Sequence, residues 1–255
     1  AVPNATGYDI YIYKDNKKKY LKHKTVTTNS YELKGRNPGK EYKIRIRPRI
    51  RTTFGVFTGE TTDLTFRTKP AKVTEVKASA VKTSSFKLTW NETKATSCYY
   101  VYQYSTKKKK YVKVATANGN SYTVSGLKAG TTYKFKIKSV KLSGGKSFST
   151  NTSAVYSFTT KPDKVSKVKL SARKKTYLTL TWDKVNGAEK YQIFMYNKEK
   201  KKYVRITTVT GKNKYKVKEL NAGKTYKFKI KAVKNLNGKN YFSEFSDIFT
   251  FTTKK

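Results

Sequence analysis

The sequence predicts an all-β chain, built as an elongated row of tandem antiparallel β-sandwiches. One pattern of about 92 residues recurs along the 255-residue chain, which indicates a repeat architecture. Within each copy, short segments alternate apolar and polar residues with a period of two, and turns rich in Gly, Asn and Lys separate them. Aromatic residues make up 14% of the chain, including 21 tyrosines, and this favours strands.

The expected strands follow one another in the same order in each repeat. Two of the repeats contain a strand that ends in tryptophan: FKLTW (86–90) and LTLTW (178–182). A tyrosine-rich strand comes next: YDIYIY (8–13), YYVYQY (99–104) and YQIFMY (191–196). A basic run that leads into a further strand follows it: KKKYLKHKT (17–25), KKKKYVKVAT (107–116) and KKKYVRITT (200–208). A strand with a cation at nearly every second position comes later: EYKIRIRPRI (41–50), TYKFKIKSVK (132–141) and TYKFKIKAVK (225–234).

Two Lys-Pro pairs mark the expected boundaries between repeats, at 69–70 and 161–162. They divide the chain into residues 1–69, 70–161 and 162–255, which are called modules 1, 2 and 3. Module 1 starts at the tyrosine-rich strand, so it is expected to lack its first two strands and to belong to a longer natural protein. Such a module has half a core and an open edge, through which self-association is one expected outcome.

The repeats resemble fibronectin type III modules, a family related in architecture to immunoglobulin domains. The matching residues are the strand-ending tryptophans, the Tyr-x-aliphatic start of the next strand, and a Leu-x-Ala-Gly-x-x-Tyr corner: Trp90, Trp182, Tyr99, Val101, Tyr191, Ile193, Leu127, Gly130, Tyr133, Leu220, Gly223 and Tyr226. The resemblance implies a two-sheet sandwich whose corner tyrosine hydroxyl bonds to backbone. Arg36 replaces the corner leucine in module 1, which predicts a weaker corner there.

One face of each module is the candidate binding site. In the cation-bearing strands, Phe228 and Ile230 are expected to point inward, and the lysines between them outward. The resemblance pairs this strand with the tyrosine-rich one, which adds outward residues including Asp9 and several aromatics. The candidate residues are Tyr11, Tyr13, Lys43, Arg45, Arg47, Tyr102, Tyr104, Lys134, Lys136, Lys138, Phe194, Tyr196, Lys227, Lys229 and Lys231. The hairpin tips at 17–19, 107–110 and 200–202 add further lysines.

Two interpretations of this face remain open. It is either a solvated sheet face, stabilised by packing between lysine and tyrosine, or a surface for a polyanion. The chain has 58 Lys and Arg against 15 Asp and Glu, a formal net charge of +43, and this imbalance favours an anionic partner. Aromatic plates beside cations suit phosphate-linked sugars or stacked bases.

The expected function is therefore non-enzymatic. The chain is interpreted as an adhesive arm or spacer, secreted or associated with a bacterial cell wall, that attaches to an anionic glycopolymer such as teichoic acid. Binding of extracellular nucleic acid is one alternative. A structural filament or spacer subunit with an acidic protein partner is another.

Enzyme chemistry finds little support in the sequence. His23 is the only histidine and Cys98 the only cysteine, so neither a Ser-His pair nor a Cys-His dyad is expected. We predict no catalytic residue, no metal site and no cofactor. No apolar run is long enough to span a membrane.

Overall fold

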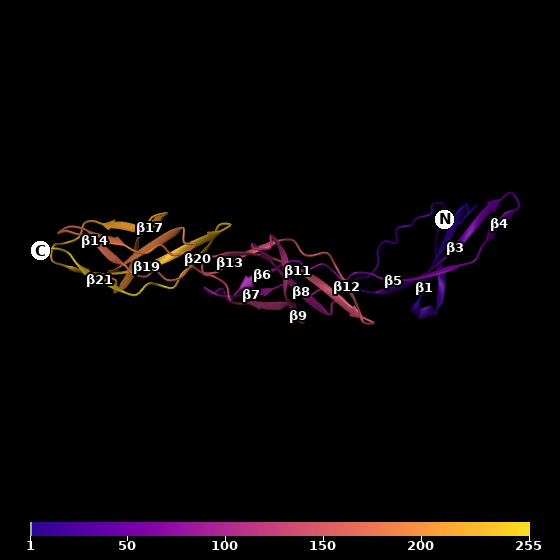
Figure 1. Ribbon diagram of the computed structural model, residues 1–255, viewed down its shortest axis with the longest axis horizontal. Coiled ribbons are helices and arrows are strands. Elements are labelled where there is room, and N and C mark those ends of the chain that lie inside the picture. Colours follow the sequence, from indigo (N-terminus) through magenta and orange to yellow (C-terminus); the bar gives the residue numbers. More distant parts are fainter. Residues whose placement is uncertain (1) are drawn as a thin grey trace.

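The computed structural model describes residues 2–255, and it is all-β, as the sequence predicts. Its strands are accompanied in that range by one short 3-10 helix, η1 (Asp15–Lys17). The three modules lie in a row, which makes the molecule elongated (Figure 1). No helix within residues 2–255 has the length and apolar character needed to cross a membrane.

Module 1 contains a single five-stranded sheet among its described residues. The strands are β1 (Gly7–Lys14), β2 (Lys19–Val26), β3 (Glu41–Thr52), β4 (Gly55–Thr58) and β5 (Thr62–Arg67). They lie in the order β2-β1-β3-β4, and β5 also pairs with β3. Within residues 2–69, no second sheet packs against this one.

Modules 2 and 3 each contain two sheets, one of three strands and one of five. In module 2 the strands are β6 (Lys77–Ser79), β7 (Phe86–Thr89) and β10 (Ser121–Val124), and then β8 (Cys98–Ser105), β9 (Lys110–Ala117), β11 (Thr132–Ser143), β12 (Lys146–Ser149) and β13 (Tyr156–Thr159). In module 3 they are β14 (Lys169–Arg173), β15 (Leu178–Thr181) and β18 (Lys214–Val217), and then β16 (Lys190–Asn197), β17 (Lys202–Thr210), β19 (Thr225–Leu236), β20 (Lys239–Phe242) and β21 (Phe249–Thr252).

The cores of modules 2 and 3 form between their two sheets. In module 3, Leu178 and Leu180 of β15 meet Phe228 and Ile230 of β19, and all four side chains are fully buried. The predicted inward orientation of Phe228 and Ile230 is therefore confirmed. A buried tryptophan, Trp182, packs edge-on against a tyrosine of β16 and closes one end of this core.

Tyrosine hydroxyls fix two turns in every module. The corner hydroxyls of Tyr42, Tyr133 and Tyr226 accept backbone hydrogen bonds at 2.8, 2.8 and 2.9 Å. We expected a weaker corner in module 1 because Arg36 replaces leucine, but the Tyr42 hydrogen bond is as short as those of Tyr133 and Tyr226. The Arg36 guanidinium lies 5.6 Å from the centre of the Tyr42 ring. A second set of tyrosines, Tyr8, Tyr99 and Tyr191, lies at the start of the tyrosine-rich strand. Their hydroxyls accept hydrogen bonds from backbone N–H groups of the segment that precedes this strand.

The junctions between modules bring the same two turns into contact. The corner glycine of one module lies against the loop that precedes the tyrosine-rich strand of the next: Gly39 meets Ala95, and Gly130 meets Asn186 and Gly187. A Cβ atom on Gly130 would lie 2.2 Å from the Asn186 carbonyl oxygen, so the junction has no room for a side chain at this position. The Asn186 amide also donates a hydrogen bond of 3.3 Å to the Ala129 carbonyl.

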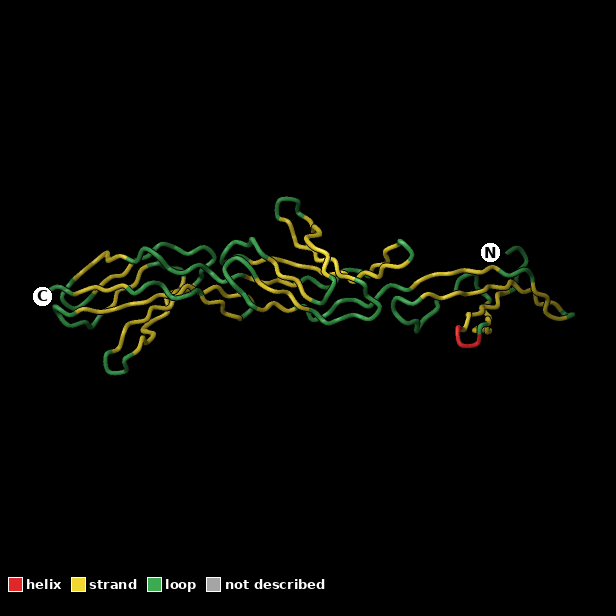
Figure 2. Tube along the Cα trace, turned by 90° about the horizontal axis from the view of Figure 1, so that it is seen from below, coloured by secondary structure: helices red, strands yellow, loops and turns green. Residues whose placement is uncertain are grey.

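The long hairpins of successive modules project from alternate sides of the row. Figure 2 shows the hairpin that holds η1, between β1 and β2, on one side of the molecule. The β8–β9 hairpin of module 2 projects to the opposite side, and the β16–β17 hairpin of module 3 returns to the first. Consecutive modules are therefore turned about the long axis relative to one another.

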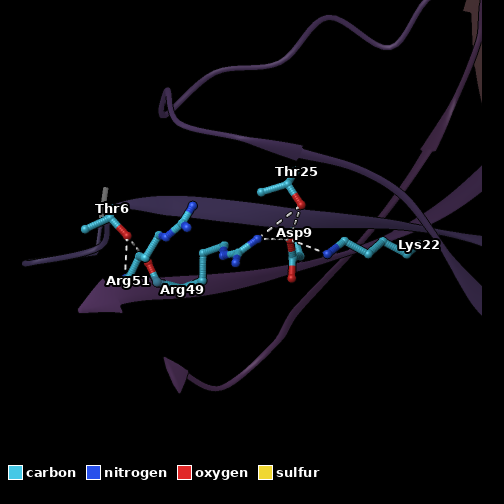
Figure 3. A network of polar contacts seen from close by, with 6 residues as sticks. All are labelled: Thr6, Asp9, Lys22, Thr25, Arg49 and Arg51. Carbon is cyan, nitrogen blue, oxygen red and sulfur yellow. Dashed lines mark hydrogen bonds and ion pairs between the residues drawn. The ribbon is translucent and has the colours of Figure 1, made fainter. Parts of the chain in front are cut away.

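The outward placement expected for Asp9 is observed, but its side chain is buried there. It lies on the outer face of β1 but is only 5% exposed, because Lys22, Thr25 and Arg49 surround its carboxylate (Figure 3). Lys22 lies 2.9 Å and Arg49 3.3 Å from Oδ1, and the Thr25 hydroxyl donates to the same oxygen. Burial acts to raise the pKa of Asp9, but the hydrogen bonds and the two cations outweigh it and hold the pKa below its usual range.

We expect Asp9→Asn to destabilise module 1 by about 1.5–3 kcal/mol, because the amide removes the negative charge that the hydrogen bonds and the two cations surround. A carboxylate with a lowered folded-state pKa stabilises above its unfolded pKa of about 3.9, and this stabilisation is lost as the pH falls through the lowered value. Hydrogen exchange of β1 amides across acid pH measures both effects. An Asp9→Asn chain with the wild-type acid profile would contradict this account.

We expect Gly130→Ala to loosen the junction between modules 2 and 3, since the new methyl group meets the Asn186 carbonyl. Gly126→Ala is the matched control, because Gly126 also has a positive φ but nothing within 4 Å of a Cβ. Small-angle X-ray scattering of the full chain should show a broader distribution of module orientations for Gly130→Ala only. Equal scattering from both variants would mean that the glycine contact does not hold the junction.

Candidate polyanion-binding face

The candidate face is built on the pairing of two strands in each module. Strand β11 pairs with β8 so that Lys136 stands opposite Tyr102, and Lys138 opposite Tyr100. In module 3, β19 pairs with β16 and places Lys229 opposite Phe194. In module 1, β3 pairs with β1, with Arg45 opposite Tyr11 and Arg47 opposite Asp9. The strand pairing that the family resemblance implied is the one observed.

A cluster of two tyrosines and one cation recurs in all three modules, here called the Tyr–Tyr–cation triad. Its members are Tyr13, Tyr20 and Arg45 in module 1, Tyr104, Tyr111 and Lys136 in module 2, and Tyr196, Tyr203 and Lys229 in module 3. The two rings of each triad are 5.3 Å apart and meet edge-on. The cation lies 4.2, 4.5 and 4.4 Å from the centre of the second ring in modules 1, 2 and 3.

Sequence reasoning missed the second tyrosine of each triad, namely Tyr20, Tyr111 and Tyr203. The signal was present, because each of these tyrosines directly follows the basic run of a hairpin. Register explains the contact: Tyr104 faces Tyr111 across β8 and β9, and Tyr196 faces Tyr203 across β16 and β17. A β-bulge in each hairpin lies close to this pair.

The remaining candidate residues lie around the triads. Lys134 stands opposite Ser157 of β13, and Lys227 stands opposite Thr250 of β21. These partners are not tyrosines, and they do not belong to the tyrosine-rich strand. Lys43 lies 5.7 Å from the Tyr13 ring and Arg47 lies 5.7 Å from the Tyr11 ring. Lys231 packs over a further aromatic, Phe245, at 4.0 Å.

The three triads differ in how their cation is balanced. Arg45 forms an ion pair of 2.7 Å with Asp63, and the hydrogen bond from Arg45 holds the pKa of that carboxyl below its usual range. Within residues 2–255, no carboxylate lies at ion-pair distance from Lys136 or Lys229. Among the described residues, the cations of modules 2 and 3 therefore contact aromatic rings and have no ion-pair partner.

The second tyrosine of each triad has a raised pKa, which keeps its ring neutral at physiological pH. Burial raises the pKa of Tyr111 and Tyr203, and the neighbouring tyrosine raises it further. Burial also raises the pKa of Tyr20, with Asp63 acting in the same direction. Neutral rings offer an uncharged aromatic surface beside the cation, which is suited to stacking on a sugar or a base.

Each hairpin tip holds a lysine in a strained backbone conformation. Lys18, Lys109 and Lys201 occupy equivalent positions, and their φ angles are 48°, 51° and 48°. This left-handed region costs roughly 1–2 kcal/mol for a residue with a side chain and favours glycine or asparagine. Three modules nevertheless carry lysine there, beside further exposed lysines of the same tip.

The one histidine and the one cysteine of the sequence lie in different modules, His23 in module 1 and Cys98 in module 2. His23 contacts the Tyr31 hydroxyl at 3.1 Å, and burial together with Arg36, Lys14 and Lys24 lowers its pKa. Cys98 is buried, and burial raises the pKa of its thiol. Within residues 2–255, no group of three or more His, Cys, Asp or Glu side chains is arranged to hold a metal ion.

The paired sheets and corner tyrosines define a tandem β-sandwich protein. The sequence profile of the Fibronectin type III domain family matches residues 71–155 and 163–248, which together make up more than half of the chain. The chain belongs to the fibronectin type III family.

Comparison with known proteins gives further similarities. The receptor-type tyrosine-protein phosphatase eta of Gallus gallus is 27% identical over 230 residues, which cover 89% of this chain and 16% of that protein. A two-domain fibronectin type III segment of chicken tenascin has a TM-score of 0.47 at 19% identity, over 72% of this chain and 100% of the segment. The FN1–FN3 domains of chicken CNTN1 have a TM-score of 0.40 at 16% identity, over 100% of this chain and 92% of that chain.

We expect Lys229→Met to destabilise module 3 by about 0.5–1 kcal/mol, since the apolar stem is kept while the cation over Tyr203 is removed. Lys227→Met is the matched control. Lys227 lies two residues before Lys229 on the same strand, and it stands opposite Thr250 of β21 and not opposite an aromatic residue. Denaturant unfolding of the two variants measures the difference. Equal unfolding midpoints would show that the cation of the triad contributes nothing to stability.

Proposed function

We propose that this chain is a non-catalytic adhesive arm or spacer, extracellular in location, that attaches electrostatically to an anionic glycopolymer. A phosphate-linked polymer of the teichoic acid type, as found in bacterial cell walls, fits the surface chemistry. Phosphates pair with the lysines of the hairpin tips and triads, and sugar or polyol units pack on the neutral tyrosines. Weak contacts on three modules add through effective concentration.

The observation that carries this proposal is the recurrence of the triad and the strained tip lysine on all three modules. A solvated sheet face explains outward lysines, but it does not favour a lysine at a backbone position where glycine is more stable. Strain that persists at equivalent sites is a reason to look for a function of the side chain. Fifteen acidic residues also cannot neutralise 58 basic ones, so most cations lack an internal partner.

The arrangement of the hairpins favours a polymer mesh over a flat surface. Because the β8–β9 hairpin projects to the side opposite the other two, a flat surface could meet the tips of modules 1 and 3 only (Figure 2). A flexible polymer network that surrounds the row reaches all three tips. A spacer threaded through such a network would be held from both sides.

Membership of the fibronectin type III family supports the adhesive or spacer role. The chain spans only 16% of the length of the receptor phosphatase, so the activity of that protein is not transferred to this chain. Nucleic acid is the alternative ligand, since bases would stack on the same tyrosines and phosphates would meet the same lysines. Binding assays with both polymers separate these two ligands.

We expect a chain with Lys18→Gly, Lys109→Gly and Lys201→Gly to keep its fold while its affinity for purified poly(glycerol phosphate) falls. Glycine relieves the strain at each tip, so thermal stability should be unchanged or higher. The slope of log affinity against log salt should become shallower by up to about three, because each tip lysine neutralises one phosphate. Calorimetric titration over a salt series measures the affinity.

The control replaces three lysines of the three-stranded sheets, Lys87, Lys169 and Lys214, by glutamine; all three are exposed. An equal fall in affinity in the control would mean that the chain binds the polymer as a generic polycation, with no special role for the tip lysines. Binding of the wild-type chain to cell walls stripped of teichoic acid, or equal displacement by DNA, would count against the glycopolymer as ligand. No binding at low salt would leave only the spacer role.

A further inference from the structure

A cleft lies at the junction between modules 2 and 3. Two adjoining hollows of about 430 and 450 Å³ form it, and Ala78, Lys239 and Tyr241 line both of them. Ala78 belongs to β6 of module 2, whereas Lys239 and Tyr241 belong to β20 of module 3. Figure 1 shows β20 at the end of module 3 that adjoins module 2. The cleft is therefore bounded by one strand from each of the two modules.

Both strands meet the cleft with an open edge. Strand β6 is the outermost strand in the order β10-β7-β6, and β20 is the outermost strand in the order β17-β16-β19-β20. Among residues 2–255, no strand pairs with these two outer edges. Residues 78–81 and 239–244 line the cleft without interruption. Because side chains of a strand alternate between its faces, an uninterrupted run of lining residues indicates that the cleft meets the strand edge and its backbone groups.

Module 2 differs from module 3 at the end of this first strand. Strand β14 of module 3 includes Ala172, which pairs with Thr179. In module 2, the counterpart β6 ends at Ser79, and Ala80, at the position of Ala172, has a φ angle of 47°. Glycine adopts this left-handed conformation more readily than alanine does. The backbone of Ala80 and Val81 consequently leaves the ladder with β7 and lies at the cleft.

The walls of the cleft are basic. Lys161, Lys231 and Lys239 line its smaller hollow, where Glu244 is the one carboxylate among the described residues. Glu244 already lies 3.3 Å from the Lys161 ammonium group. Within residues 2–255, neither Lys231 nor Lys239 has a carboxylate at ion-pair distance. The cleft is therefore complementary in charge to an acidic ligand.

We propose that the cleft between modules 2 and 3 is a docking site for an extended acidic segment of a protein partner. The segment would add as a strand along the outer edge of β20, with residues 80 and 81 beside it on the side of module 2. Its carboxylates would pair with Lys231 and Lys239. Phe242, which lines the cleft and is 38% exposed, offers an apolar contact to an intervening side chain.

The open strand edges favour a peptide over other occupants. An anionic glycopolymer matches the charge of the cleft, but it has no regular row of peptide N–H and C=O groups to pair with a strand edge. A second copy of this chain would bring cations to cations, because each copy has 58 basic and 15 acidic residues. The proposal does not rest on glycopolymer binding, which is assigned to the hairpin tips and the triads.

The test adds a peptide of alternating Glu and Val residues to the full chain at low salt and follows amide hydrogen exchange at residues 239–242. We expect exchange there to slow about ten-fold when the peptide is present at about ten times its dissociation constant. The control peptide is methylated at every backbone nitrogen, so it keeps the charges but cannot donate to a ladder. It should give no protection.

Two variants of the chain locate the contact. We expect Lys239→Gln to weaken binding of the unmethylated peptide, since one of the two cations without an ion-pair partner is lost. Lys146→Gln is the matched control, because Lys146 occupies the equivalent position in β12 and lines neither hollow. It should leave the affinity unchanged.

Protection by the unmethylated peptide alone, weakened by Lys239→Gln and not by Lys146→Gln, supports the proposal. Absence of protection at the highest soluble peptide concentration overturns it, as does equal protection by the methylated peptide. Equal protection by poly(glycerol phosphate) overturns it by assigning the cleft to the glycopolymer. Protection that grows with the concentration of the chain alone overturns it by assigning the cleft to a second copy. None of these measurements alters the tip lysines, so their outcome is separate from the test of glycopolymer binding.

Discussion

The structure depends on one pairing, between the cation-bearing strand and the tyrosine-rich strand of each module. Side chains of a strand alternate between its two faces, so β11 sends Phe135 and Ile137 into the core and Lys136 and Lys138 to the outside. Pairing with β8 then sets a row of aromatic rings beside the row of cations. Core and candidate site are thus two faces of the same ladder, and a shift of register by one residue would exchange them.

The cost of this arrangement is electrostatic. Lysines at alternate positions of a strand repel each other, and few carboxylates are available to balance them. The triads offset part of this repulsion by placing each cation over a tyrosine ring. Across residues 2–255, only module 1 adds a carboxylate to its triad, through Asp63, and only module 1 buries an aspartate under its outer cations, at Asp9. In the described part of the other two modules, the central cation has a tyrosine ring and no carboxylate beside it.

Tight turns form close contacts between successive modules. Corner glycines such as Gly130 have no side chain, which lets the turn approach the neighbouring loop closely. Successive modules are turned relative to one another at these junctions, so the hairpin tips point to alternate sides. Module 1 shows the consequence of a single sheet: SYELK (30–34) has the pattern of a strand, yet it stays irregular because a strand forms only beside a partner.

The sequence by itself determined the all-β class, the repeat, the strand order and the outward lysines, because period-two alternation and turn residues are local properties. It also pointed to most of the candidate face. Only the tertiary structure revealed Tyr111 and Tyr203 as members of the triads, the burial of Asp9, and the alternate sides of the hairpins. These depend on cross-strand register, on β-bulges and on contacts between modules, which bring together residues far apart in the chain, and no local pattern encodes such distances.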